Sequence, residues 1–170
     1  MSDQLIRDHI RAMTLDSTPV VAFPEIASDL RRTLAAALPA LESLSDADAS
    51  RPRAPGKWSP KQVIGHLIDS AANNHQRFVR AQQGTELVSP SYAQDHWVDC
   101  QGYVERPWRD LTALWHAYNQ HLACVIERIP ADRARVRCTI GANQPVTLAY
   151  VAEDYVAHMR HHLAQVSARL

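Results

Sequence analysis

Hydrophobic residues recur with the period of an α-helix in four stretches of the chain. The first stretch begins near Pro24, because proline suits the first position of a helix. Its apolar residues lie three or four positions apart and predict one buried face: Ile26, Leu30, Leu34, Ala37, Leu38 and Leu41. Pro39 stands late in this pattern, so we expect the helix to kink or end there.

The second stretch has the clearest helix start. Ser59 can cap the helix, Pro60 fits its first position, and Gln62 completes a capping box. We expect the helix to run to about Gln83, before Gly84. One of its faces carries Val63, Leu67, Ser70, Asn74 and Phe78.

The third and fourth stretches are equally regular. The third runs from near Pro107 to Ile129, with an apolar stripe formed by Leu111, Leu114, Trp115, Tyr118, Leu122, Val125 and Ile129. The fourth begins after Thr147, a plausible cap, and continues almost to the end of the sequence. Its predicted buried stripe is Leu148, Val151, Tyr155, His158, Met159, His162 and Val166.

The connections between the helices differ in character. Residues 45–57 contain two prolines and a glycine and are typical of a loop. Residues 84–106 show no sustained period, and a loop of that length in a compact domain is often functional. In residues 130–146, Val136 and Ile140 could form a short extended piece.

Four helices of this length predict an all-α four-helix bundle formed by residues 24–170. Residues 1–23 form an N-terminal extension, in which Leu5, Ile6, Ile10 and Met13 could make a short docking helix. A chain of 170 residues is long enough for one domain with a core that needs no disulfides.

Composition excludes several classes of function. The 18 basic and 18 acidic side chains balance, so no positive excess favours a nucleic-acid partner. The three cysteines are odd in number and form no C-x-x-C pair, which argues against a disulfide framework and a thiolate zinc site. The sequence has neither a signal peptide pattern nor a membrane-length apolar run, so we expect no membrane contact and a cytoplasmic location.

Nine histidines are the unusual feature of the composition. His158 and His162 are four residues apart on the predicted buried stripe, where one metal ion could bind both rings. His66 lies on the inner edge of the second helix and is the third candidate ligand. For each histidine the alternative is a core imidazole hydrogen-bonded to a neighbour, and two ligands at this spacing also occur by chance.

Three imidazoles would leave a position on the metal ion for a water molecule or a substrate, whereas structural zinc sites usually have four protein ligands. Imidazole ligands suit zinc and nickel, and iron or copper stays possible. Each ring should donate its second nitrogen to an acceptor, for which Asp69, Asp154 and Gln165 are candidates. The alternative for Asp69 and Asp154 is a solvated charge on the surface without a role at the metal site. His96 and Trp97 in the long loop, and His121 on the third helix, are candidates for the surrounding pocket.

Three segments resemble motifs of the DinB/YfiT family. The segment from Trp58 and Ser59 through His66 to Asp69 resembles that family's opening motif. The segment His158-x-x-x-His162-x-x-Gln165 resembles its closing helix, and Asp95-His96-Trp97 resembles its acidic-aromatic segment. The resemblance implies an up-down-down-up four-helix bundle, often a homodimer, with metal ligands at His66, His158 and His162.

The resemblance also narrows the expected activity. Described members include metal-dependent hydrolases and transferases that use low-molecular-weight thiols such as bacillithiol or mycothiol. We therefore expect a metal-dependent hydrolase or thiol S-transferase acting on a small molecule. The alternatives are a bundle in which the metal ion is only structural, and a bundle without a metal ion.

Overall fold

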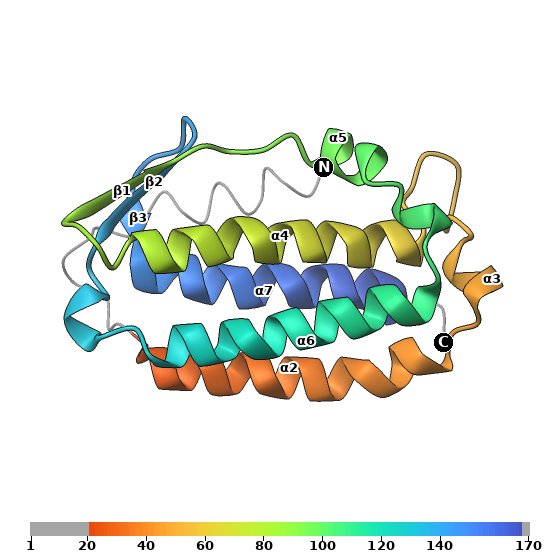
Figure 1. The fold of residues 1–170 in the computed structure, drawn as a ribbon, viewed down its shortest axis with the longest axis horizontal. Helices are drawn as coiled ribbons and strands as arrows, with labels where there is room; N and C mark the ends of the chain where they lie inside the picture. Colours follow the sequence, from red (N-terminus) through yellow and green to blue (C-terminus); the bar gives the residue numbers. More distant parts are fainter. Residues whose placement is uncertain (1–20, 168–170) are drawn as a thin grey trace.

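Four helices of about twenty residues dominate the fold, as the hydrophobic period predicts (Figure 1). The computed structural model describes residues 21–167, without the side chain of Ser167. The long helices are α2 (Phe23–Ser43), α4 (Pro60–Arg80), α6 (Trp108–Glu127) and α7 (Leu148–Ser167). The predicted N-terminal docking helix lies outside the described residues.

The predicted caps of α4 and α7 are present. Ser59 and Gln62 form the reciprocal capping box at the start of α4. The hydroxyl of Thr147 accepts a hydrogen bond of 3.1 Å from the backbone N–H of Tyr150 at the start of α7. These side chains satisfy backbone donors that the first helical turn leaves open, so both starts are fixed locally.

Helix α2 does not end at Pro39, which was one of the two predictions for this residue. It continues to Ser43 with Pro39 inside it. Proline removes the hydrogen bond to the carbonyl four residues earlier, that of Ala35. Ala35 and Pro39 are both exposed. Water can therefore satisfy the freed carbonyl, and the helix persists.

The four helices run in an up-down-down-up order (Figure 1). The colours show α2 and α7 running from left to right, and α4 and α6 running from right to left. Helices α4 and α6 are therefore parallel neighbours, and residues 81–107 must return along the whole bundle between them. This confirms the predicted fold class.

The core lies between the inner faces of the four helices. On α7 the apolar residues of the predicted stripe are buried, and on α6 Trp115 is fully buried. The polar exceptions include His66, Asp69 and Arg77, which are all on α4. Buried ionisable groups need hydrogen-bond or charged partners, and such groups gather at functional sites. We therefore expect the functional site on the inner face of α4.

The three connections between the long helices contain more structure than the sequence predicts. Residues 84–106 hold strand β1 (Glu86–Ser89), helix α5 (Gln94–Cys100) and the 3-10 turn η2 (Tyr103–Glu105). Residues 45–57 include the short helix α3 (Asp46–Ala49). After α6 come the turn η3 (Ala131–Arg133) and the strands β2 (Arg137–Ile140) and β3 (Val146–Thr147). Strand β2 contains Ile140, one of the two residues expected in an extended piece.

The strands form a small sheet in the order β1-β2-β3 at one end of the bundle (Figure 1). Strand β1 pairs with β2 in parallel, with Glu86 opposite Arg137, and β2 pairs with β3 antiparallel. The sheet thus fastens the start of the returning segment to the connection before α7. None of the described helices is long and apolar enough to cross a membrane.

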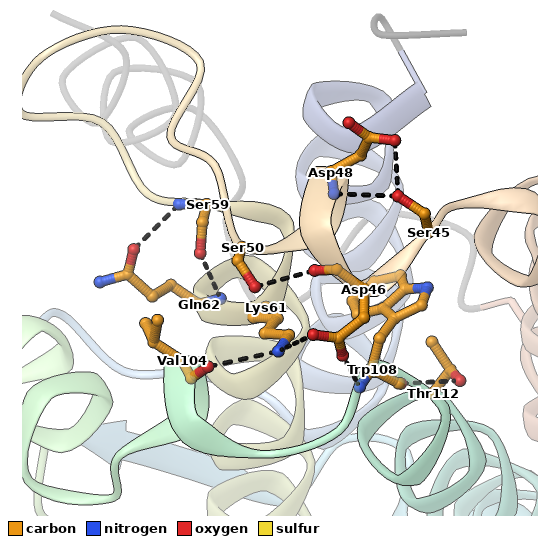
Figure 2. Close-up of polar contacts among 10 residues, drawn as sticks. All are labelled: Ser45, Asp46, Asp48, Ser50, Ser59, Lys61, Gln62, Val104, Trp108 and Thr112. Carbon is orange, nitrogen blue, oxygen red and sulfur yellow. Dashed lines mark hydrogen bonds and ion pairs between the residues drawn. The ribbon is translucent and has the colours of Figure 1, made fainter.

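A polar network joins three elements at the other end (Figure 2). The carboxylate of Asp46 accepts hydrogen bonds from the backbone N–H of Trp108 (2.7 Å) and from the ammonium group of Lys61 (3.0 Å). Lys61 is only 3% exposed and also donates to the carbonyl of Val104. Helices α3, α4 and α6 are therefore held together beside the start of α4.

Candidate metal centre

Three histidine rings meet between α4 and α7. His66 lies in the second turn of α4 and is fully buried, whereas His158 and His162 are half-buried and one turn apart near the end of α7. Because α4 and α7 are antiparallel, these turns lie at the same end of the bundle (Figure 1). The ring centroid of His66 is 5.1 Å from that of His158 and 4.6 Å from that of His162.

The ring nitrogens fit one metal ion. One nitrogen from each ring can be chosen so that all three lie within 4.8 Å of one another, and the Nε2 atoms of His66 and His158 are 3.2 Å apart. Two nitrogens bound to a tetrahedral zinc ion at about 2.05 Å lie ~3.3 Å apart. A hydrogen bond between the neutral rings of His66 and His158 would also fit the distance of 3.2 Å. It would not explain why the ring of His162 lies close to both, whereas a shared metal ion would.

Burial keeps these rings in the form that binds metals. Together with smaller contributions from the neighbouring rings of His162 and His158, it lowers the pKa of His66 to about 3. Burial also lowers the pKa of His158 to about 4, with smaller contributions from His162 and His161. Both rings are therefore neutral at pH 7, and each has a lone pair available for a metal ion.

No fourth ligand from the protein joins this group within residues 21–167. The cluster contains the three histidines and no cysteine, aspartate or glutamate side chain. A bound ion would therefore keep at least one position for a water molecule or a substrate. This open arrangement is typical of catalytic rather than structural zinc sites.

Trp58 forms a wall of the site that the sequence interpretation did not include among the site residues. Its ring centroid lies 5.1 Å from that of His66 and 6.5 Å from that of His162, and the side chain is half-buried. Its indole shields these rings on one side. Its place directly before the capping box of α4 was the signal that could have identified it.

Asp69 lies one turn after His66, but it does not accept a hydrogen bond from a histidine ring as predicted. Its Oδ1 accepts hydrogen bonds from the hydroxyl of Tyr103 (2.7 Å) and the amide of Gln101 (2.5 Å). Among the described residues, the Nδ1 atom of His66 and the Oδ2 atom of Asp69 are both buried without a hydrogen-bond partner. Asp69 therefore joins α4 to the returning segment, and no hydrogen bond orients the ring of His66 through it.

The other two predicted acceptors also have different surroundings. Gln165 is exposed, and its amide lies 3.1 Å from Nε2 of His161, a ring outside the cluster. Asp154 is one turn before His158, and its nearest charged influence is the guanidinium of Arg77. The Asp154 side chain is exposed, yet the surrounding protein removes enough water to raise its pKa.

The three predicted pocket residues are divided between two places. His96 and Trp97 lie on α5; His96 is exposed, and the ring of Trp97 lies 5.1 Å from that of Tyr92. His121 is exposed on α6, and its ring lies 5.3 Å from that of His75 on α4. His121 therefore belongs to an interface between α4 and α6 and not to the three-histidine cluster.

A surface groove of about 600 Å³ lies between the end of α4 and strand β1, and His75 and Arg80 are among its lining residues. None of the three clustered histidines lines it. Its lining residues include no cluster of side chains that could bind a metal ion together. The site is therefore assigned from the histidine geometry and not from the groove.

Residues 29–166 match the DinB superfamily, and the chain belongs to that family. The match includes His66, His158 and His162. It also confirms the resemblance found in the sequence.

Relatives in this family carry names that refer to metal-dependent hydrolysis. A protein of Geobacillus kaustophilus named "Putative metal-dependent hydrolase" is 26% identical over 153 residues, which is 88% of this chain and 80% of that one. A relative of the same name from Geobacillus thermodenitrificans is 27% identical over 131 residues, 75% of this chain and 72% of its own. YfiT of Bacillus subtilis is 25% identical over 75% of this chain and 72% of its own.

Two solved structures share the fold. YfiT from Bacillus subtilis, described as a probable metal-dependent hydrolase with an unusual four-helix bundle topology, superposes with a TM-score of 0.77 at 20% identity, covering 91% of this chain and 90% of YfiT. The mycothiol-dependent maleylpyruvate isomerase gives a TM-score of 0.69 at 14% identity, covering 92% of this chain and 69% of the isomerase. These likenesses establish the up-down-down-up bundle.

Proposed function

We propose that this protein is a metal-dependent enzyme, either a hydrolase or a low-molecular-weight-thiol S-transferase, with His66, His158 and His162 as the metal ligands. The observation that carries the proposal is the convergence of three imidazoles without a fourth ligand from the described residues. The rings of His66 and His158 are neutral at pH 7. Zinc and nickel are the divalent ions that this set of nitrogen donors suits best.

The chain's own residues supply the geometry and exclude water. The fully buried ring of His66 fixes the inner edge of the site, and the two rings on α7 close it from the opposite helix. Trp58 shields His66 and His162 on one side, which strengthens electrostatic interactions at the site. A divalent ion bound here would act as a Lewis acid and make a coordinated water or thiol easier to deprotonate.

The two activities have different support. The names of the sequence relatives favour hydrolysis. The likeness to a mycothiol-dependent isomerase favours a small thiol as a second substrate. A thiol would be deprotonated on the metal ion, which would prepare it for transfer.

The first test is the metal content of the purified protein and of two matched variants. We expect about one divalent ion per chain in the wild type, and loss of that ion with retained helicity in His158→Ala. His161→Ala is the control, because His161 is an exposed neighbour on the same helix. A wild-type protein without metal after growth in zinc and nickel, or equal metal in both variants, would contradict the assignment.

The second test is activity of the metal-loaded protein on amides, epoxides and thiol conjugates. We expect turnover of one class that disappears in His158→Ala and survives in His161→Ala. The alternative is a metal ion that only ties α4 to α7. That alternative predicts no turnover and no exchangeable water on the ion, which relaxation measurements on a Co²⁺-substituted protein can detect.

A further inference from the structure

Arg77 is a buried cation on the same face of α4 as His66. It follows His66 by eleven residues, which is just over three helical turns and about 16 Å along the axis. Only 8% of the residue is exposed. Arg77 lies in the last turn of α4, so the position extends the polar side of this helix from the histidine cluster to its C-terminal end.

The guanidinium of Arg77 makes few direct contacts with hydrogen-bond acceptors. Its Nη1 donates a hydrogen bond of 3.2 Å to the side-chain oxygen of Asn74, and its Nε is buried without a partner. Among residues 21–167, no ion pair with a carboxylate includes Arg77. Burial lowers the pKa of this group, but arginine keeps its charge in proteins. Asp154 attracts this charge without a direct ion pair. A buried charge whose Nε has no acceptor is costly, so an anion that accepts directly from the guanidinium would stabilise it.

The surroundings of Arg77 reach both the returning segment and α7. Tyr92 interacts electrostatically with Arg77, is hydrogen-bonded to Ser70, and packs its ring against Trp97. Asp154, one turn before His158, faces Arg77 from α7. Arg77 therefore belongs to a polar strip between α4 and α7, formed by His66, Ser70, Arg77, Asp154, His158 and His162.

The arrangement selects the kind of anion. Burial raises the pKa of Tyr92 to about 12, so its hydroxyl stays protonated at neutral pH and can donate a hydrogen bond. Arg77 brings one positive charge, and the nearby Asp154 opposes a second negative charge on a ligand. A carboxylate, which is a planar monoanion, matches the guanidinium fork better than a dianionic phosphate.

We propose that Arg77 anchors a carboxylate-binding subsite at the far end of this polar strip, and that the subsite holds a carboxylate group of the substrate. The role of the bound group as part of a substrate rests on the proposed function, whereas anion binding itself does not. An elongated substrate would then have its reacting group at the three histidines and its carboxylate beside Arg77 and Tyr92.

The test is a titration of the metal-free protein with butyrate, followed through the Nε–H signal of Arg77 in a ¹⁵N NMR spectrum. We expect a saturable shift of this signal with butyrate and none with butyramide, its uncharged analogue. Arg77→Lys assigns the signal, because it removes this resonance and keeps the positive charge. Inorganic phosphate should bind more weakly than butyrate because of Asp154.

Three variants make the test selective. Ligand-observed NMR should show at least tenfold weaker butyrate binding in Arg77→Gln and unchanged binding in Arg80→Gln, an exposed arginine on the same helix. Asp154→Asn should strengthen binding several-fold, because it removes a competing negative charge. If Arg77→Gln does not fold, the wild-type titration and Asp154→Asn decide the question.

Two results would overturn the subsite. One is equal shifts with butyrate and butyramide, or none with either. The other is an Asp154→Asn protein that melts as early as Arg77→Gln and binds butyrate no better, since Asp154 would then be the partner of Arg77. If the wild-type protein binds butyrate but holds no metal ion as purified after growth in zinc and nickel, the proposed function is wrong and the subsite still stands.

Discussion

Gly65 lets the ring of Tyr103 lie directly against the second turn of α4, beside His66. A Cβ atom at position 65 would lie 2.1 Å from the Tyr103 ring, a distance that requires the ring to move. The hydroxyl of the same tyrosine donates to the buried Asp69. One residue without a side chain thus sets how closely the returning segment approaches the metal centre.

Gly65→Ala should therefore destabilise the protein by about 1–3 kcal/mol, the range for overpacking a core, although alanine is the better helix former. Urea denaturation monitored by circular dichroism measures the change. Gly84→Ala is the matched control, because its nearest contact would be an ordinary 3.6 Å and the change should stay within about 0.5 kcal/mol. If the contact with Tyr103 is the cause, the effect should shrink in a Tyr103→Ala background.

The convergence of the three histidines could be predicted because their spacing along the helices and their places on the buried faces are local properties of the sequence. It could not identify the partners of Asp69, since Gln101 and Tyr103 lie more than thirty residues away and reach it only through the path of the returning segment. The path of the chain also explains why His121, predicted as a pocket residue, lies elsewhere. Its position on α6 is close to the inner face, but the parallel packing of α4 and α6 pairs it with His75.

At the scale of elements, Asp46 connects α3 to the starts of α4 and α6 (Figure 2). The backbone N–H of Trp108 lowers the pKa of this carboxyl most, and Lys61 lowers it further. Since the folded pKa lies below the unfolded value of 3.8, the stabilisation is present at neutral pH. It is lost as the pH falls below about 4 through the folded pKa.

Asp46→Asn should therefore lower the free energy of unfolding at pH 7, and the difference from the wild type should shrink toward pH 3. Urea denaturation across this pH range measures both proteins. Asp132→Asn, at an exposed carboxylate in η3, is the control and should not reproduce the pattern. A wild-type advantage that stays constant from pH 7 to pH 3 would show that the charge of Asp46 is not responsible.

The elements also show where periodicity stops being informative. The long helices follow from patterns of ten or more residues, and their predicted starts agree with the structure within a residue or two. Strand β1 and helix α5 are four and seven residues long, too short for a period to emerge from a mixed sequence. Strand β1 exists because β2, about fifty residues later, supplies its hydrogen-bond partners.

At the scale of the whole molecule, apolar residues from all four long helices fill the core, so we expect the bundle to fold without a metal ion. A chelator should therefore leave the far-UV circular dichroism spectrum at 25 °C unchanged. It should still lower the melting temperature, since free metal at 1,000 times its Kd stabilises a folded protein by about 4 kcal/mol. Re-addition of zinc should reverse the shift. Unfolding at 25 °C on chelation would instead indicate a structural metal ion.

The family resemblance predicts a homodimer. Light scattering after size exclusion should then give twice the chain mass of 19.0 kDa at micromolar concentration. A mass of one chain across the accessible concentration range would contradict this prediction. The mass of His158→Ala, measured in parallel, would show whether assembly depends on the metal centre.

The histidines of the metal centre are separated by 92 residues between His66 and His158. At translation rates of about 5–20 residues per second, His66 is synthesised roughly 5 to 18 seconds before its first partner. No nascent chain that ends before α7 can hold the ion with all three rings. If the three rings hold a metal ion as proposed, loading comes after translation has produced the last helix, and a prematurely terminated chain would leave the ribosome without the complete set of ligands.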